Sequence, residues 1–312
     1  MNIGMLFQAM PGNVAQGIIW GVMALGVFMT FKILDFADLS VDGSFATGGA
    51  VTVVLVTSGW SSPSALVMAF AVGILAGLAT GILHTLLGIP DILAGILTQI
   101  ALYSVNLNIM SGAANMALSV NQYNLLVSLR YISRTILVAS GITLVLICLM
   151  YWYFGTEQGS AIRATGTNPA MSRAQGINIS LMKVIALSLS NGIVAFSGGL
   201  LAQYQGFADI NMGRGAIVIG LAAVIIGEVI GHALIGKRMN FIVRMLFVVI
   251  GAIMYYIAIG IVLWLRMPTN NLKLFTAVIV ALFLAVPYLK DKANNSFAKA
   301  GRRGAAYHDS TD

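Results

Sequence analysis

Charged side chains are scarce in this chain of 312 residues, where Asp, Glu, Lys and Arg together make up 9%. A typical soluble domain carries about 25%. Each charge at the centre of a membrane helix costs about 2.5–3.5 kcal/mol, so this depletion is typical of a protein that crosses a membrane many times. With 59% apolar residues, the composition favours such a protein over a soluble domain.

Cysteine is almost absent as well. Cys148 is the single cysteine and lies in an apolar run, which excludes a disulfide framework and a clustered cysteine metal site. We therefore expect no metal site. The opening residues, MNIGMLFQAMPGN, have no basic group before the apolar stretch, so we also expect no cleavable signal peptide.

A complete phosphate-binding loop is missing too. Residues 231–238, GHALIGKR, approach the pattern G-x-x-x-x-G-K-[ST], but Arg238 stands where a hydroxyl residue would bind magnesium. The stretch also closes an apolar run instead of joining a strand to a helix. We expect no cofactor bound by this chain and no catalytic residues in it.

The formal net charge is nevertheless +7. The basic residues stand in the connections between apolar runs and in the tail at 291–312. A solvated tail beside anionic membrane lipid accounts for them without a nucleic-acid partner. We therefore expect a transmembrane domain over 1–290 and a cytoplasmic basic tail after it.

The apolar runs predict an all-α polytopic membrane protein, since a spanning helix needs about 20 mostly apolar residues. We expect about nine spans (8–10), and the short, glycine-bearing second one suits a broken or re-entrant helix. The nine ranges are 12–31, 42–58, 64–87, 91–110, 134–154, 183–203, 215–235, 241–265 and 272–289.

The basic residues also predict the orientation, because Lys and Arg accumulate on the cytoplasmic side. With nine spans and a cytoplasmic C-terminus, twelve of the 17 Lys and Arg residues lie inside. This arrangement is N-out, C-in. It places the connection at 155–182 in the cytoplasm and the connection at 111–133 outside. The outer connection would either form a surface helix that docks a binding protein or be an ordinary loop.

Two pairs of segments echo each other. DFADLSVDGSFATGGAV (35–51) resembles GFADINMGRGAIVIGLA (206–222), and GIPDILAGILT (88–98) faintly resembles RMPTNNLKLFTA (266–277). The first member of each pair is expected inside and the second outside, which is the pattern of an inverted repeat. The repeats would be 12–110 and 183–289, with 134–154 as connector. Coincidence among apolar residues is the alternative.

The connection at 155–182 contains SAIRATGTNPAMSRAQGINI (160–179). Gly166 is expected to end one helical turn, Asn168 to cap the next, and Pro169 to stand at its first position. A short helix over 169–175 would then end at Gly176. Arg163 and Arg173 could pair with acidic groups of a partner. An ordinary cytoplasmic loop, the alternative, needs only the arginines.

This loop resembles the coupling loop of ABC importer permeases of the branched-chain amino acid type, in which R-A-x-G-x-N-P-x-x-A-x-x-x-G-I docks into a cytoplasmic ATPase. The alanine stands later here than in the family pattern. FADLSVDGSF, IPDILAGILT, GLAAVIIGEVI and MPTNNLKLFTAVIV are similar to a subgroup of tryptophan/tyrosine transport permeases, so the resemblance covers most of 12–290. The matching residues are Arg163, Ala164, Gly166, Asn168, Pro169, Ala174, Gly176 and Ile177.

The resemblance implies a type II-like importer of the bacterial plasma membrane. Its partners would be a cytoplasmic ATP-binding subunit, which holds ATP and Mg, an extracytoplasmic solute-binding protein, and a second permease, as a homodimer. The substrate would be a small solute, an aromatic or branched-chain amino acid, moved by alternating access. The ATPase-coupling residues would be Arg163, Ala164, Gly166, Asn168, Pro169, Arg173 and Gly176.

Three aspartates close together in the sequence, and one glutamate near the end of a span, permit a different hypothesis. The chain could be a stand-alone ion-coupled secondary transporter. Asp35, Asp38 and Asp42 would share a face if they stood on one helix, and such a set could bind a cation. A cytoplasmic turn in which Asp42 or Ser40 caps the next helix explains them as well. Glu228, four residues before His232, could relay protons or simply pair with a nearby group.

The substrate pathway is expected along the two echo segments, because broken helices at matching places mark transport routes. Small hydroxyl and amide side chains suit a route that must release its cargo. Each could instead satisfy a neighbouring backbone carbonyl. The residues are Ser40, Ser44, Thr47, Asn191, Asn211 and Gly215.

Overall fold

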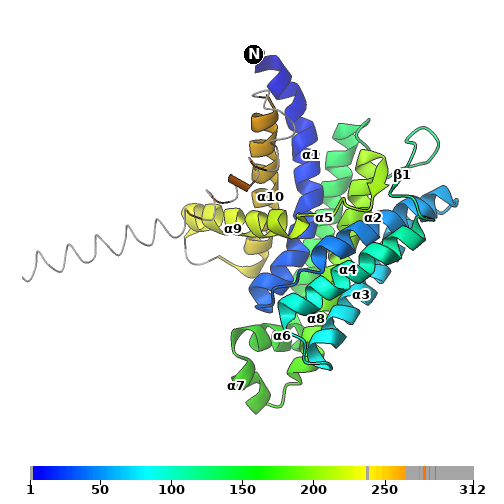
Figure 1. Ribbon diagram of the computed structural model, residues 1–312. Helices are drawn as coiled ribbons and strands as arrows, with labels where there is room; N and C mark the ends of the chain where they lie inside the picture. The colour runs from blue at the N-terminus through cyan, green and yellow to red at the C-terminus, as the bar shows by residue number, and fades with distance from the viewer. Residues whose placement is uncertain are drawn as a thin grey trace, which may run out of the picture.

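The computed structural model describes residues 3–236, 239–264 and the five single residues 274, 277, 278, 281 and 285. The described chain is largely helical, with one small two-stranded sheet (Figure 1). Seven of its helices are long and apolar enough to cross a membrane. The all-α, multi-span prediction is therefore confirmed at this level.

The helices follow the predicted apolar runs closely. The helix α1 continues into the π-helical turn η1, and α2 is the short helix that was expected for the second run. The elements are α1 Ile3–Phe28, η1 Met29–Ile33, α2 Val41–Thr57, α3 Ser62–Thr85, α4 Asp91–Ile109, α5 Ile132–Gly155, α6 Glu157–Thr167, α7 Pro169–Ala174, α8 Ile179–Gln205, α9 Ala216–Ile235 and α10 Phe241–Trp264.

Eight of the nine predicted spans coincide with a helix, and the ninth, 272–289, falls almost wholly outside the described residues. Residues 111–131 of the connection at 111–133 contain no helix, and α5 begins at Ile132. Its strand β1, Asn115–Ala117, pairs antiparallel with β2, Phe207–Asp209. Of the two forms expected for this connection, the surface helix is therefore wrong, because part of the segment pairs with a strand instead.

Glycine faces hold the long helices close together. Gly77 of α3 lies against the backbone of Leu187 in α8, where a Cβ would clash, and a Cβ on Gly17 of α1 would come within 2.7 Å of the Ile253 Cα in α10. Small residues let membrane helices approach closely in this way. Ser197 of α8 also donates from Oγ to the Ile19 carbonyl of α1 at 2.7 Å, so α1 and α8 are joined at the centre.

The same packing scheme occurs twice. The helix α3 packs along α8, with α2 against both, and α10 packs along α1, with α9 against both. The helix α9 runs across the direction of α1 and α10 (Figure 1). The two short or tilted helices, α2 and α9, thus occupy corresponding places in two groups of three.

Candidate functional site

The exposed elbow consists of residues 157–178, which contain α6, α7 and the turn into α8. Figure 1 shows α6 and α7 at the end of the molecule opposite the N-terminus. Thr156 caps α6 by accepting from the Gly159 N–H at 3.3 Å. Asn168 caps α7 by accepting from the Met171 N–H at 3.0 Å, with Pro169 next to it. The predicted short helix is therefore present.

Gly166 plays a different part from the one expected. It does not end a helical turn, because α6 continues to Thr167. Instead it lies against the Ile33 carbonyl at the end of η1, so closely that no Cβ would fit. The prediction that Gly166 ends a helical turn is wrong. A glycine is required there because it permits a close contact between the elbow and the end of the first span.

The elbow presents unpaired positive charge. Arg163, Asn168, Pro169, Arg173 and Gly176 are exposed, while Ala164 and Gly166 are half-buried. Arg163 donates to the Ser160 hydroxyl at 3.2 Å, and within the described chain neither Arg163 nor Arg173 forms an ion pair. The side chain of Met171 is 58% exposed. These groups are free to meet another molecule, and the coupling role of the seven residues stays a prediction.

A second region, the junction, consists of residues 34–44, 206–217 and Asn191. The carboxylate of Asp38 is buried there and accepts from the Ser40 N–H at 2.9 Å, the Ser40 hydroxyl at 2.5 Å and the Asn191 amide at 2.7 Å. Asn191 stands near the middle of α8. The helix α2 therefore begins about halfway along a spanning helix, as expected for a broken segment.

Asp42 connects the two echo segments. Its carboxylate accepts from the backbone N–H groups of Gly215 and Ile217, both at 2.9 Å. A carboxylate is favourable at the N-terminus of a helix because of the helix dipole, so the first turn of α2 caps α9. The predicted cap on α2 itself is wrong, since neither Ser40 nor Asp42 makes a side-chain bond there.

The three aspartates do not form one cation site. Asp35 is exposed in a positive-φ turn, Asp38 is buried against Asn191, and Asp42 faces α9. They do not share a helix face because η1 ends at Ile33 and α2 begins only at Val41. The described residues contain no group of three or more side chains suited to a metal ion.

Glu228 of α9 pairs with Lys32 of η1 at 2.9 Å, not with His232. Ionisable groups within or near membrane spans commonly pair with one another, and this pair joins the first span to α9. The arrangement links α9 to the same turn that touches Gly166.

The expected pathway residues separate into two groups. The side chains of Ser40, Ser44, Thr47 and Asn191 are fully buried, and Thr47 bonds the Gly43 carbonyl at 2.9 Å. Asn211 is exposed and Gly215 half-buried. This conformation thus places four of the six within the helix packing. Their role in transport stays a prediction.

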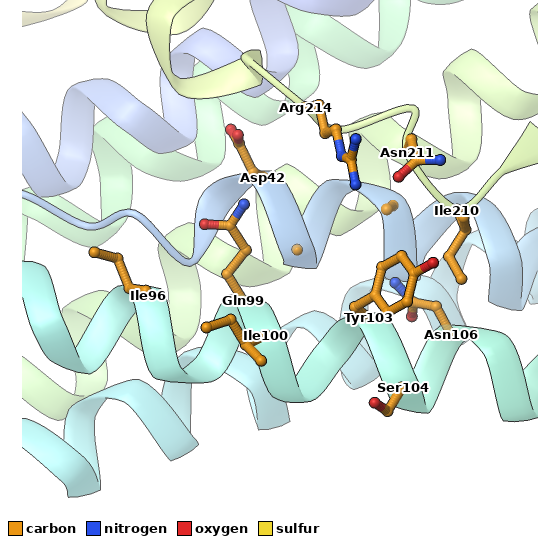
Figure 2. A pocket seen from close by; sticks show the side chains of 12 residues that line it. Asp42, Ile96, Gln99, Ile100, Tyr103, Ser104, Asn106, Ile210, Asn211 and Arg214 are labelled. Carbon is orange, nitrogen blue, oxygen red and sulfur yellow. The ribbon is translucent and has the colours of Figure 1, made fainter.

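A pocket of about 470 Å³ opens beside the junction. Figure 2 shows Gln99, Tyr103 and Asn106 on α4 facing Asn211 and Arg214 from the 210–214 segment. The full lining is Asp42, Gly43, Ala46, Ile96, Gln99, Ile100, Tyr103, Ser104, Asn106, Ile210, Asn211 and Arg214.

Sequence reasoning identified Asn211 and Asp42 but missed the α4 side of this pocket. A usable signal was present, because Gln99, Tyr103 and Asn106 are spaced by four and three residues in an apolar run. That spacing places polar groups on one face of a helix. Arg214 is not among the expected pathway residues, because nothing in the sequence shows that the segment around it packs against α2.

The chain resembles known transport proteins along most of its length. The family model described as "Branched-chain amino acid transport system / permease component" matches residues 12–287. A tyrosine transport system permease protein of Clostridioides difficile is 37% identical, over 91% of this chain and 93% of the relative. An uncharacterized protein of Rickettsia prowazekii is 31% identical, over 86% and 94%. A galactofuranose transporter permease protein of Escherichia coli is 30% identical, over 74% and 66%. No solved structure matches significantly.

Proposed function

Because the chain belongs to the family of permease components of branched-chain amino acid transport systems, we propose that it is the membrane-spanning subunit of an ATP-driven amino acid importer. The chain is a multi-pass protein of the bacterial inner membrane. As a permease it is a transport subunit, and the proposal assigns ATP and Mg to a separate ATP-binding subunit.

The exposed elbow is the observation that carries this proposal. Its shape is fixed by caps at Thr156 and Asn168, and its two arginines have no acidic partner within the described chain. A rigid surface with free guanidinium groups suits bidentate pairing with carboxylates. The partner in this proposal is the ATP-binding subunit, which would grip α7.

A short physical route leads from the elbow to the junction. Gly166 touches the end of η1, and Lys32 of η1 pairs with Glu228 of α9. Residues 34–40 then lead from η1 directly to Asp38 and the start of α2. Displacement of the elbow would therefore move η1 and change the packing of both α2 and α9. The π-helical form of η1 agrees with such a role, because π-helical turns often occur at functional sites in helices.

The repeated packing supports the inverted repeat, with α1–α4 related to α8–α10 and 272–289. The N-termini of α2 and α9 meet at Asp42, as the corresponding half-helices of such repeats do. In this proposal the chain is N-out, C-in, and two copies form a homodimer around a shared cavity. Alternating access would then reopen that cavity on the other side of the membrane.

The proposed substrate is an aromatic or branched-chain amino acid. Its supports are the family's description and the relative described as a tyrosine transport system permease. An extracytoplasmic solute-binding protein would deliver it at the end that carries β1 and β2. Membrane lipid would surround the spans and the basic tail.

The stand-alone ion-coupled transporter is supported less. Of the four acids that it would use, Asp35 is exposed, Asp42 caps α9 and Glu228 is paired with Lys32. Within the described part of the chain, Asp38 is the one of these four that is buried and has no cationic partner. One carboxylate does not assemble an ion site. Transport by the lone chain under a sodium or proton gradient, abolished in Asp38→Asn, would favour this alternative.

Copurification from native membranes tests the proposed coupling. We expect ATPase activity to copurify with the wild-type chain and to be lost from preparations of the double variant Arg163→Glu/Arg173→Glu. The unfolding temperature of the double variant itself should stay unchanged. Arg130→Glu is the matched control, because Arg130 is an exposed arginine in the 111–133 connection. Retention of ATPase activity by the double variant at wild-type levels would contradict the proposal.

A further inference from the structure

The pocket beside the junction lies at the level of the middle of a spanning helix. Ser40 donates to Asn191, near the centre of α8, at 3.2 Å. Asp42 follows two residues later and accepts from Gly215, the neighbour of Arg214. An arginine exposed to lipid at such a depth would be costly. The open side of this pocket therefore faces water or protein.

Arg214 is the uncompensated charge of the pocket. Its side chain is exposed, and no ion pair involves it within the part of the chain that the structure describes. Asp42 also lines the pocket, but its carboxylate is turned to the N-terminus of α9, whose N–H groups it satisfies (Figure 2). The guanidinium, with five N–H donors, is thus available to a carboxylate.

Asn106 supplies an unused acceptor on the facing helix. Its side chain is 1% exposed, lines the pocket, and has an Oδ1 without a hydrogen-bond partner. Buried polar atoms are normally paired, so an orphan in a pocket wall marks a place where a bound donor fits. Gln99 lies seven residues, about two turns, before Asn106 on the same face of α4 and adds a second amide to the pocket.

An apolar wall completes the set. Ile96, Ile100 and Tyr103 of α4 line the same pocket, and the side chain of Tyr103 is 45% exposed. Ligand pockets of this size are typically apolar, with a few polar groups that fix orientation. A cation, an unpaired amide acceptor in the pocket wall and an apolar wall match the three parts of a free amino acid.

We propose that this pocket binds an amino acid as the zwitterion: Arg214 binds the α-carboxylate, Asn106 accepts from the α-ammonium, and the α4 wall contacts the side chain. The inference rests on the proposed function for the transported class. It adds the residues that recognise the backbone groups of that substrate. Tyr103 and Ile100 would accept an aromatic or a branched aliphatic side chain.

Protection from cysteine labelling tests the site on the purified full chain in lipid nanodiscs. Ser104→Cys, at the exposed rim of the pocket, is introduced into a Cys148→Ser background and labelled with a water-soluble maleimide. L-Phenylalanine and L-leucine are the probes, at concentrations up to tens of millimolar. We expect either or both to slow labelling, and neither phenethylamine, which lacks the carboxylate, nor 3-phenylpropionate, which lacks the ammonium, to match them.

Arg214 variants then sharpen the assignment. Loss of a charge-assisted bond should weaken protection about tenfold or more in Arg214→Gln, with partial recovery in Arg214→Lys. Arg130→Gln should behave as wild type. Ser119→Cys, exposed in the 111–133 connection, should label at a rate that no probe changes.

The outcomes separate the pocket from the broader function. Absence of protection by both amino acids, equal protection by the two analogues, or unchanged protection in Arg214→Gln would each overturn the pocket assignment. That result would leave ATPase copurification through the elbow intact. Conversely, Arg214-dependent protection in a chain that brings down no ATPase activity would support the pocket and contradict the importer.

Discussion

The elbow and the junction are built in opposite ways. The elbow is exposed and its bonds are local, such as the one from Met171 to Asn168 three residues away. The junction is buried and its bonds join distant segments, as between Asp38 and Asn191 or between Asp42 and Gly215. Local bonds keep a surface rigid while it meets a partner. Long-range bonds instead hold two halves of the molecule in one arrangement.

The two regions are nevertheless in contact. Gly166 lies against Ile33, and residues 34–40 continue from there into the junction. A change of position at the elbow therefore reaches the start of α2 through the short connection 34–40, which Asp38 anchors to Asn191. The contrast predicts that damage to the junction lowers the stability of the whole molecule, whereas damage to the elbow changes only coupling.

The largest effect is expected from Gly48→Val, in the part of α2 that follows the junction. Gly48 of α2 lies against the Ala195 carbonyl of α8, so closely that a side chain would force the helices apart. Overpacking costs about 1–3 kcal/mol and occasionally more. The upper end applies here, because the obstructing atoms belong to the backbone of α8 and cannot rotate away as a side chain can. Thermal unfolding in detergent, followed by tryptophan fluorescence, should show a large loss of stability.

Gly141→Val is the matched control for that substitution. Gly141 stands in α5, and a Cβ there would meet no atom within 4 Å. Equal losses in the two variants would show that valine in a span, and not the α2–α8 contact, sets the cost.

An intermediate effect is expected from Asn191→Ala. The amide of Asn191 donates to Asp38 at 2.7 Å and to the Leu187 carbonyl at 3.0 Å. Removing it leaves a buried carboxylate with one donor fewer, which costs about 1–3 kcal/mol. The unfolding temperature should fall, and Asn191→Gln should not restore it, because the longer side chain does not fit the same fully buried site.

The smallest effect on global stability is expected from Asn168→Ala. Loss of an N-cap costs about 1 kcal/mol, but here it falls on an exposed helix of six residues. Hydrogen exchange should accelerate within 169–175 while the unfolding temperature stays at the wild-type value. A fall in unfolding temperature as large as that of Asn191→Ala would erase the proposed distinction between the regions.

The parts that the sequence predicts are those with local signals. The Asn168–Pro169 cap and Gly176, whose φ is +82°, form one continuous motif. The apolar runs give most helix ends closely, but α1 begins at Ile3 and α8 at Ile179, before the predicted starts at 12 and 183. Contacts between distant segments carry no such signal. The cap of Asp42 on α9 joins residues 173 and 175 apart, and Gly166 meets Ile33 only because two remote helices fold together.

The pocket lies between these extremes. Its α4 residues repeat at helical spacing and were open to prediction, whereas Arg214 reaches it only because the 206–215 segment turns inward along α2. Gly213 of that segment lies directly against the Asp42 backbone. The sequence does not distinguish an arginine in a surface loop from an arginine that lines a pocket. Only the position of Arg214 in the fold makes that distinction.

Cross-linking from α7 tests the central claim most directly. Met171→Cys, in a Cys148→Ser background, is coupled to a benzophenone maleimide in native membranes and illuminated, with Ser119→Cys as the control from the 111–133 connection. The account predicts that Met171→Cys captures an ATP-binding subunit, that nucleotide changes the yield, and that Ser119→Cys captures none. Labelling of Met171→Cys only by reagents outside the cell, or capture of the same subunit from both positions, would contradict it.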